Sequence, residues 1–379
     1  MAVNNIEAYR CLFDQDHVPK MVIGRQREMK LVSGFLLENF SLRDNEMSDD
    51  RYGSAIMVEG LRGLGKSTMS RKVLIDLKTK HTANKANMNF FTLNCWDKDE
   101  QQLLMDFTSK LKIPMADTKP VFSSTRDAWN IIYHYLRRHT DRCYNILISN
   151  SDFIPIRFFN KLLVNLKCLG INLVFTSRVG NSFQFLEHVD MCLNLDVYSL
   201  GDLNTIVEQR YQKAFLDQDN SIPKFITDTV VEFDTSRPGP CIAILKHLYP
   251  RLRDGHGEDI SLEIIQHAIR HQLPNLSYSE FELVDFMQEA TISMLLFLDN
   301  ITTHFMSSGN YYLNGDDLRE LYNMSCETLY IEPSVDEFSN YLARMLQHHI
   351  LLKSNNDPSL FFSIVPANLL KSYLDEVLK

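Results

Sequence analysis

Apolar runs of strand length alternate with amphipathic segments over the first half of the chain. Each run is bounded by polar or turn-forming residues, which predicts buried strands. These runs lie at residues 56–59, 89–95, 144–149, 171–176 and 191–195. Helical periodicity is found between them, at residues 22–36, 66–74, 100–111, 125–136 and 156–169. Strands alternating with helices predict an α/β fold, in which a parallel sheet is covered by helices on both faces.

The pattern becomes helical from Ser199 onward. Four helices are predicted at residues 203–215, 222–233, 241–252 and 262–271. A long helix at 280–304 follows, then helices at 316–328 and 335–349, and a polar turn between two apolar runs at 350–353 and 360–364. Three helices and a hairpin in this order are typical of a winged helix. We therefore expect an N-terminal lead-in at 1–20, a parallel-sheet base at 21–198, a helical lid at 199–275 and a winged-helix domain at 276–379.

Composition supports several domains and shows an uneven charge. The chain has 379 residues, of which 45% are hydrophobic, so two or three domains with their own cores can form. The net charge is −9, and residues 285–379 hold thirteen Asp and Glu against five Lys and Arg. Because duplex DNA is bound largely by neutralising its phosphates with Lys and Arg, this acidic end is a poor candidate for generic DNA binding.

Cysteine and hydropathy patterns predict an intracellular protein. No apolar run is long enough to span a bilayer, and the N-terminus lacks the basic start and apolar stretch of a secretory signal, so no membrane partner is expected. The seven cysteines are scattered without a C-x-x-C pair, which argues against a disulfide framework or a zinc site. Cys95 and Cys192 lie in apolar runs and are expected to be buried.

The turn after the first strand carries the pattern G-x-x-x-x-G-K-[ST], from Gly60 to Ser67. Its glycines let the backbone turn its N–H groups inward, and the helix that starts behind them completes a cradle for phosphate. Lys66 is expected to reach the β- and γ-phosphates and the Ser67 hydroxyl to hold the metal, so the predicted cofactors are ATP and Mg²⁺. The predicted nucleotide-binding residues are Gly60, Leu61, Arg62, Gly63, Leu64, Gly65, Lys66, Ser67 and Thr68.

The third predicted strand ends without the carboxylates that hydrolysis needs. A P-loop ATPase places an acidic residue there for Mg²⁺, and a second one to polarise the attacking water. Ser149 and Asn150 stand at those positions, and Asp152, two residues beyond Asn150, is expected to cap the following helix or turn. Because Asn150 cannot act as a base, we predict a nucleotide that is structural or a switch, no catalytic residue, and no efficient enzyme activity.

Other candidates each keep two interpretations. Arg178, after the fourth strand, could face the γ-phosphate or lie on the surface. Arg237 could reach phosphate from the lid, although its Pro- and Gly-rich neighbourhood favours a structural turn. His348 and His349 at a helix end have no further ligands in view, which favours capping or exposure over metal binding.

Four blocks together resemble the replication-initiator branch of the AAA+ ATPases, which comprises archaeal initiators, the ATPase-fold subunits of the eukaryotic origin recognition complex and their helicase-loading relative. They are Val18–Glu28, with its V-P…R-x-x-E pattern, the loop Gly60–Ser67, the first lid helix at 198–215 and the C-terminal block Leu321–Leu346. The resemblance covers nearly the whole chain and implies a P-loop AAA+ parallel-sheet domain with a helical lid, followed by a C-terminal winged helix.

The chain departs from the family at its catalytic positions. The family's Asp-Glu pair falls on Ser149 and Asn150, and its sensor Asn falls near Ser177–Arg178. No Arg stands in Leu186–Asp190, where the finger for a neighbour's nucleotide is expected, and the lid sensor Arg falls near Gly239. The resemblance therefore implies a subunit that kept the fold while other subunits of a ring carry out hydrolysis.

The function expected from this resemblance is that of an origin recognition or replication-initiation subunit. Its partners would be other origin recognition complex subunits, double-stranded DNA mainly within the complex, and the replicative helicase loading machinery. Basic contacts would come from the sheet domain, at Lys78, Lys80, Lys85 and at Arg137, Arg138 and Arg142. The acidic winged helix is expected to dock on a neighbour, and a eukaryotic member would be nuclear and chromatin-associated. The alternative is a signalling-type P-loop ATPase switch that acts through protein–protein contacts.

Overall fold

The computed structural model describes residues 11–14, 16–45, 52–80, 88–113, 124–139, 142–178, 188–215, 221–254, 261–273, 276 and 280–379. Within these residues the chain forms two compact units, and each is described by itself. The sheet unit comprises residues 16–197, and the helical unit comprises residues 11–14 together with residues 198–379.

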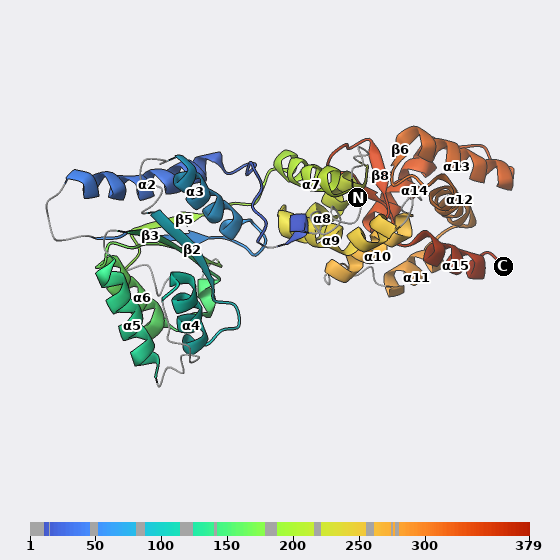
Figure 1. The fold of residues 1–379 in the computed structure, drawn as a ribbon. Coiled ribbons are helices and arrows are strands. Elements are labelled where there is room, and N and C mark those ends of the chain that lie inside the picture. Colours follow the sequence, from blue (N-terminus) through green and yellow to red (C-terminus); the bar gives the residue numbers. More distant parts are fainter. Residues whose placement is uncertain are drawn as a thin grey trace. The chain divides into compact units, whose positions relative to one another are not determined.

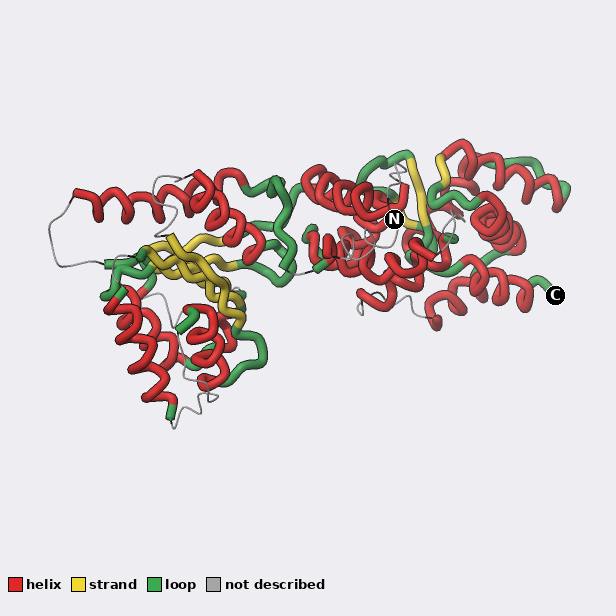
Figure 2. The backbone as a smooth tube through the Cα atoms, viewed as in Figure 1, coloured by secondary structure: helices red, strands yellow, loops and turns green. Residues whose placement is uncertain are grey.

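The sheet unit is a five-stranded parallel sheet between two layers of helices, as the alternating pattern predicts (Figures 1 and 2). The strands are ordered β2-β3-β4-β1-β5 across the sheet. Helices α2 and α3 lie over one face, and α4, α5 and α6 lie over the other (Figure 1). The strands are β1 Ala55–Glu59, β2 Met88–Asn94, β3 Cys143–Ser149, β4 Asn172–Ser177 and β5 Met191–Asn194. The helices are α2 Gln26–Asn45, α3 Lys66–Lys80, α4 Glu100–Leu111, α5 Thr125–Arg138, the short 3₁₀ turn η4 Ser151–Phe153, and α6 Ile156–Lys167.

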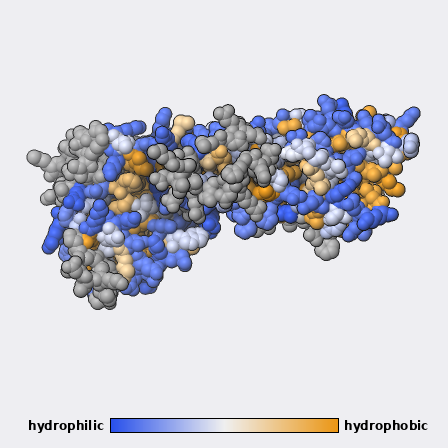
Figure 3. All heavy atoms as spheres, turned by 45° about the vertical axis from the view of Figure 1, so that its right-hand side comes forward, coloured by the Kyte–Doolittle hydropathy of each residue, from blue (hydrophilic) through white to orange (hydrophobic). Residues whose placement is uncertain are grey.

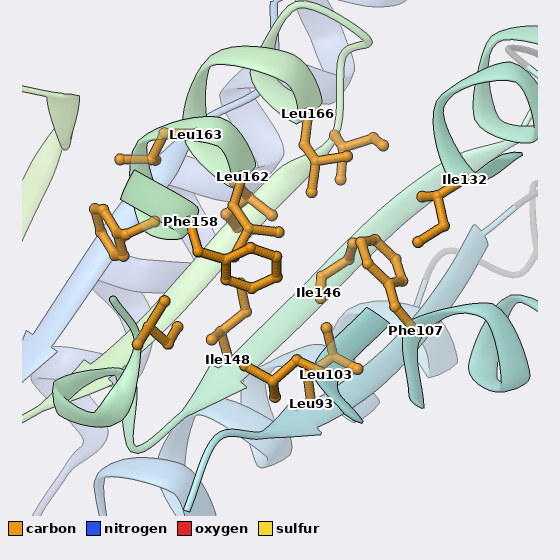
Figure 4. Packing of buried hydrophobic residues seen from close by; sticks show 14 of the residues in the cluster. Leu93, Leu103, Phe107, Ile132, Ile146, Ile148, Phe158, Leu162, Leu163 and Leu166 are labelled. Atoms are coloured by element: carbon orange, nitrogen blue, oxygen red, sulfur yellow. The ribbon is translucent and has the colours of Figure 1, made fainter. Parts of the chain in front are cut away.

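The central strands are apolar because both of their faces are covered. Every residue of β1, β3 and β4 is buried. Figure 4 shows one side of this core, where Phe107 of α4, Ile132 of α5 and Phe158 of α6 pack on Ile146 and Ile148 of β3. Burying these side chains removes apolar surface from water and stabilises the sheet. The loop Gly60–Ser67, called the P-loop below, leaves the sheet at the carboxyl edge of its strands.

The helical unit contains the remaining elements. It begins with η2 (Cys11–Phe13), whose Phe13 ring lies 5.5 Å from Tyr249 and 6.0 Å from Phe215. Its helices are α7 Leu200–Phe215, α8 Ser221–Phe233, α9 Pro238–Asp254, α10 Leu262–Gln272, α11 Glu280–Glu289, α12 Ile292–Ser308, α13 Gly315–Leu329, α14 Val335–Gln347 and α15 Ala367–Val377. A three-stranded antiparallel sheet, β6 Leu313–Asn314, β8 Leu360–Phe362 and β7 Leu352–Lys353 in that order, completes the unit. The described part of the chain has no helix long and apolar enough to cross a membrane.

Three details differ from the sequence-based prediction. The long helix predicted at 280–304 is two helices, because Thr291 caps a new one by accepting a hydrogen bond from the Met294 amide at 3.3 Å. The hairpin has a third strand, β6, which is too short for periodicity to reveal. Cys95 is buried as predicted, whereas the prediction that Cys192 is buried is wrong: β5 is an edge strand and the Cys192 side chain is exposed.

Candidate functional site: the loop after the first strand

The P-loop joins β1 to α3 at the carboxyl edge of the sheet. Gly60, Gly63 and Gly65 have φ angles of 149°, 88° and 81°, which other residues adopt only with strain. A β-carbon at Gly60 would lie 3.1 Å from the carbonyl oxygen of Leu195, the residue after strand β5, so this close approach also restricts the position to glycine. Helix α3 begins at Lys66, and the N–H groups of its first turn lie directly behind the loop.

Lys66 folds back over the loop. Its Nζ donates hydrogen bonds to the carbonyl oxygens of Gly60 at 2.7 Å and Leu61 at 2.8 Å. Burial lowers the pKa of this amine to about 8, while the Asp152 carboxylate raises it and the Arg178 guanidinium lowers it. The amine therefore lies within the loop, in a setting that favours an anionic ligand, because added negative charge would raise its pKa again.

Ser67 faces the ends of two neighbouring strands. Its Oγ lies 3.4 Å from the Thr176 Oγ1 of β4, which also accepts a hydrogen bond from the Asn150 amide at 3.2 Å. Ser149, where an ATPase would hold its metal-binding acid, has a buried Oγ that makes no hydrogen bond to the described residues. Asn150 adopts a left-handed conformation, with φ 58°, and donates from Nδ2 to Asn94 at 2.9 Å. These positions carry hydroxyls and amides, and none of them can serve as a general base.

Asp152 caps neither the η4 turn nor the following helix, contrary to the sequence-based expectation of a helix or turn cap. The residue before α6 is Pro155, and no side chain caps this helix. Because η4 turns the chain back, the Asp152 carboxylate accepts hydrogen bonds from the Ser177 hydroxyl at 2.7 Å and the Arg178 amide at 3.0 Å. Asp152 thus fixes the end of β4, and its charge also acts on Lys66.

An exposed aromatic pair beside the loop was missed by sequence reasoning. Trp96 follows β2, Phe153 follows β3, and their ring centroids lie 4.7 Å apart with about two fifths of each side chain exposed. The Arg62 guanidinium lies 5.0 Å from the Trp96 centroid, and that of Arg178 lies 5.9 Å from Trp96 and 5.8 Å from Phe153. Both aromatics lie within four residues of the ends of predicted strands of one parallel sheet, and that position was the available signal.

The other sequence candidates play structural parts or lie beyond the description. Arg237 forms an ion pair with Asp234 at 2.5 Å, which agrees with the structural interpretation. His348 packs on Phe286 at 5.2 Å between ring centroids. Residues 186–187 of the finger region, Lys85 and residues 1–10 of the lead-in lie outside the described residues. No group of three or more His, Cys, Asp or Glu side chains that could hold a metal is found among the described residues.

The entry block at residues 18–28 has a defined structural role in the sheet unit. Arg25 is buried, forms an ion pair with Glu28 at 3.2 Å and donates to the carbonyl oxygen of Asp196. Asp196 follows β5, so this block ties the start of the unit to the strand next to the P-loop strand.

The turn of the C-terminal hairpin is bound by helix α8 of the same unit. Asp228, which is fully buried, accepts hydrogen bonds from Tyr312 Oη at 2.8 Å and Ser354 Oγ at 2.6 Å. It also accepts from the amides of Asn355 and Asn356 at 2.9 and 3.0 Å and from Asn356 Nδ2 at 3.0 Å. The polar groups of this turn are therefore directed inward, toward a carboxylate.

Comparisons with known proteins give a fold over nearly the whole chain. A search of family models found no match. No curated protein matches in sequence. Among solved structures, the chain is similar to Cdc6p from Pyrobaculum aerophilum, with TM-score 0.71, 17% identity and 97% of both chains covered. It is also similar to the Aeropyrum pernix ORC2 protein in ADPNP–ADP complexes, with TM-score 0.55, 16% identity and 97% of both chains covered. A third similar structure is Drosophila ORC bound to DNA, with TM-score 0.52 and 13% identity over 99% of this chain and 92% of that chain. At these identities the likeness establishes the AAA+ fold of the Cdc6 and ORC structures.

Proposed function

We propose that this protein is a nucleotide-binding, hydrolysis-poor subunit of an origin recognition or replication-initiation assembly. The observation that carries the proposal is the P-loop from Gly60 to Ser67, which lies at the carboxyl edge of a five-stranded parallel sheet within a fold similar to Cdc6 and ORC proteins over 97% of the chain. Open α/β sheets bind their ligands at the carboxyl edge, and the phosphate-binding loop of this chain lies at that edge.

The residues present fit ATP with Mg²⁺. In this proposal the loop amides and the first turn of α3 hold the phosphates, Lys66 neutralises their charge, and Ser67 holds the metal. Bound Mg²⁺ would supply charge stabilisation for the triphosphate. Ser149 and Asn150 supply no base, and the Asp152 carboxylate is engaged by Ser177 and Arg178, so the nucleotide persists instead of being turned over.

The similar solved structures support the assembly part of the proposal. The similar Aeropyrum protein was captured with ADPNP and ADP, and the similar Drosophila complex was captured on DNA. We propose corresponding partners for this chain: other origin recognition complex subunits, double-stranded DNA within the complex, and the replicative helicase loading machinery. If the organism is eukaryotic, we propose that the protein is located in the nucleus, on chromatin.

The nucleotide part is tested by titrating purified protein with ATP and Mg²⁺ in a calorimeter. We expect binding by the wild type and by Lys72→Ala, whose Nζ pairs with Asp76 at 2.8 Å on the same helix, and no binding by Lys66→Ala. Turnover measured on the same samples is expected to stay far below about 1 s⁻¹, the lower end for phosphoryl-transfer enzymes. Equal ATP binding by Lys66→Ala and the wild type would show that the loop is not the nucleotide site. Turnover faster than this limit would show that the protein still hydrolyses ATP efficiently.

A further inference from the structure

Exposed apolar side chains gather where α13 meets α14. This segment, residues 330–335, is called the α13–α14 corner below. Tyr330 is 98% exposed, Val335 is 79% exposed and Ile331 is 47% exposed. Met324 of α13 is also exposed, and hydrophobic surface is visible over the C-terminal elements in Figure 3. Exposed apolar side chains concentrated in one short segment mark a surface that another molecule covers.

The fold of the unit does not explain Tyr330. This residue ends α13 in the left-handed conformation, with φ 57° and ψ 39°, where glycine or asparagine is favoured. Its amide donates to the Glu327 carbonyl at 3.1 Å, and the Ile331 amide donates to Cys326 at 3.0 Å, so the backbone alone closes the helix. A bulky residue strains the backbone in this conformation, and the Tyr330 ring is exposed to water. The ring is therefore available for a contact with another molecule.

The charge around the corner indicates what it contacts. Residues 313–347 hold seven Asp and Glu against two Lys and Arg. Glu320, Met324 and Glu327 follow one another at four- and three-residue spacing, so the two exposed carboxylates flank the exposed methionine on α13. Glu332 lies in the corner itself and is also exposed. Such a surface repels nucleic acid and anionic lipid, and it attracts a basic polypeptide.

The neighbouring polar surface of this module is already occupied. The turn at residues 354–357 directs its hydroxyl and amide donors into Asp228 of α8. The hairpin turn is therefore held within the unit, whereas Tyr330, Ile331 and Val335 of the corner expose their apolar side chains.

We propose that the α13–α14 corner docks a second polypeptide through a basic segment that carries apolar side chains. Tyr330 and Val335 are the apolar anchors, and Glu327, Glu332 and Asp336 pair with lysine or arginine of the partner. The proposal rests on the assembly part of the proposed function and is independent of its nucleotide part, because Lys66 belongs to the other unit.

The test uses two labelled synthetic amphipathic peptides with the same leucine positions, one with lysine and the other with glutamate at the polar positions. Fluorescence anisotropy is measured with the full chain and with a Tyr330→Ser/Val335→Ser variant, whose changes lie at exposed positions and spare the core. The matched control is Met306→Ser, which is also exposed but lies near the end of α12, outside the corner.

We expect the lysine peptide to bind the wild type, Met306→Ser and Lys66→Ala alike, and to bind the double variant about tenfold more weakly. Equal affinity for the double variant and the wild type overturns the proposal, because the attraction is then general charge. If the wild type fails to bind ATP, or if Lys66→Ala binds it equally well, the nucleotide part of the proposed function fails while the peptide result is unaffected, so the two proposals fail separately.

A second measurement identifies the partner in the native assembly. A photoreactive benzoylphenylalanine is placed at position 330 or, as control, at position 306, and the adducts are mapped by mass spectrometry. We expect an adduct from position 330 within a Lys- and Arg-rich segment of another protein, and none there from position 306. An adduct to DNA, the same adduct from both positions, or no adduct from position 330 overturns the proposal.

Discussion

Removing the Asp228 carboxylate is expected to release the C-terminal hairpin from α8. One buried carboxylate accepts hydrogen bonds from five donors that belong to Tyr312, Ser354, Asn355 and Asn356. In an Asp228→Ala variant these donors lose an ionised acceptor, and those that stay buried are left without a partner.

The magnitude follows from the network as a whole. Hydrogen bonds to a charged group contribute about 1.5–3 kcal/mol each, but the five share one acceptor and are not additive. Leaving one buried donor without a partner costs about 1–3 kcal/mol, so with two or more such donors we expect a total loss of about 3–5 kcal/mol. For a unit of this size, this lowers the melting temperature by on the order of 10 °C.

The assay is urea unfolding followed by hydrogen exchange. The control is Glu376→Ala, an exposed acidic residue of α15 in the same unit. We expect a large loss of stability and faster exchange of the Asn355 and Asn356 amides in Asp228→Ala, with little change in the control. A loss below about 1 kcal/mol, with those amides still protected, would show that this carboxylate does not hold the hairpin.

Further predictions concern the loop and the sheet unit. Affinity for ATP is expected to fall as the pH rises through about 8, because the free Lys66 amine loses its proton there; calorimetry from neutral to alkaline pH checks this, and a flat profile contradicts it. Nucleotide is expected to change the Trp96 fluorescence of a Trp129→Phe variant, because phosphate competes for the Arg62 and Arg178 side chains that lie over the indole, and no change on saturation contradicts this. Gly53→Ala is expected to destabilise the sheet unit by more than about 2 kcal/mol, because its β-carbon would lie 1.9 Å from the Ile171 carbonyl oxygen. Gly34→Ala, with nothing within 4 Å in helix α2, is expected to stabilise it by up to about 1 kcal/mol, so chemical denaturation of the two must give opposite signs. Cys192, whose side chain is exposed at the sheet edge, is expected to alkylate slowly at neutral pH and faster in Glu59→Gln, because partial desolvation of the sulfur and the neighbouring Glu59 raise its pKa to about 11; equal alkylation rates of the two proteins exclude this role of Glu59.

The sequence predicted the sheet and the P-loop because both depend on local patterns. Apolar runs such as residues 144–149 must be buried on both faces, and glycines spaced as Gly60 and Gly65 permit one kind of turn. The AAA+ fold was confirmed by the sheet order and by the similar structures. Nucleotide binding, the domain boundaries and the winged-helix role remain predictions.

Features that depend on contacts between distant parts of the chain could not be predicted from the sequence. The hydrogen bonds of Asp152 to Ser177 and Arg178 arise because η4 turns back toward β4, and no spacing within residues 149–153 reveals this. Asp228 reads as an ordinary polar position of a helix, and its burial follows from a hairpin more than a hundred residues away. The exposure of Cys192 follows from β5 lying at the edge of the sheet, which hydropathy alone does not show.

The most direct test of the central claim is affinity purification of the tagged chain from its native cell, with nuclease treatment, followed by quantitative mass spectrometry and nucleotide analysis. We expect to recover other origin recognition complex subunits in fixed ratio, together with bound ATP that is lost in the Lys66→Ala variant. Recovery of the protein alone, or with signalling partners in place of initiation subunits, would contradict the proposed function.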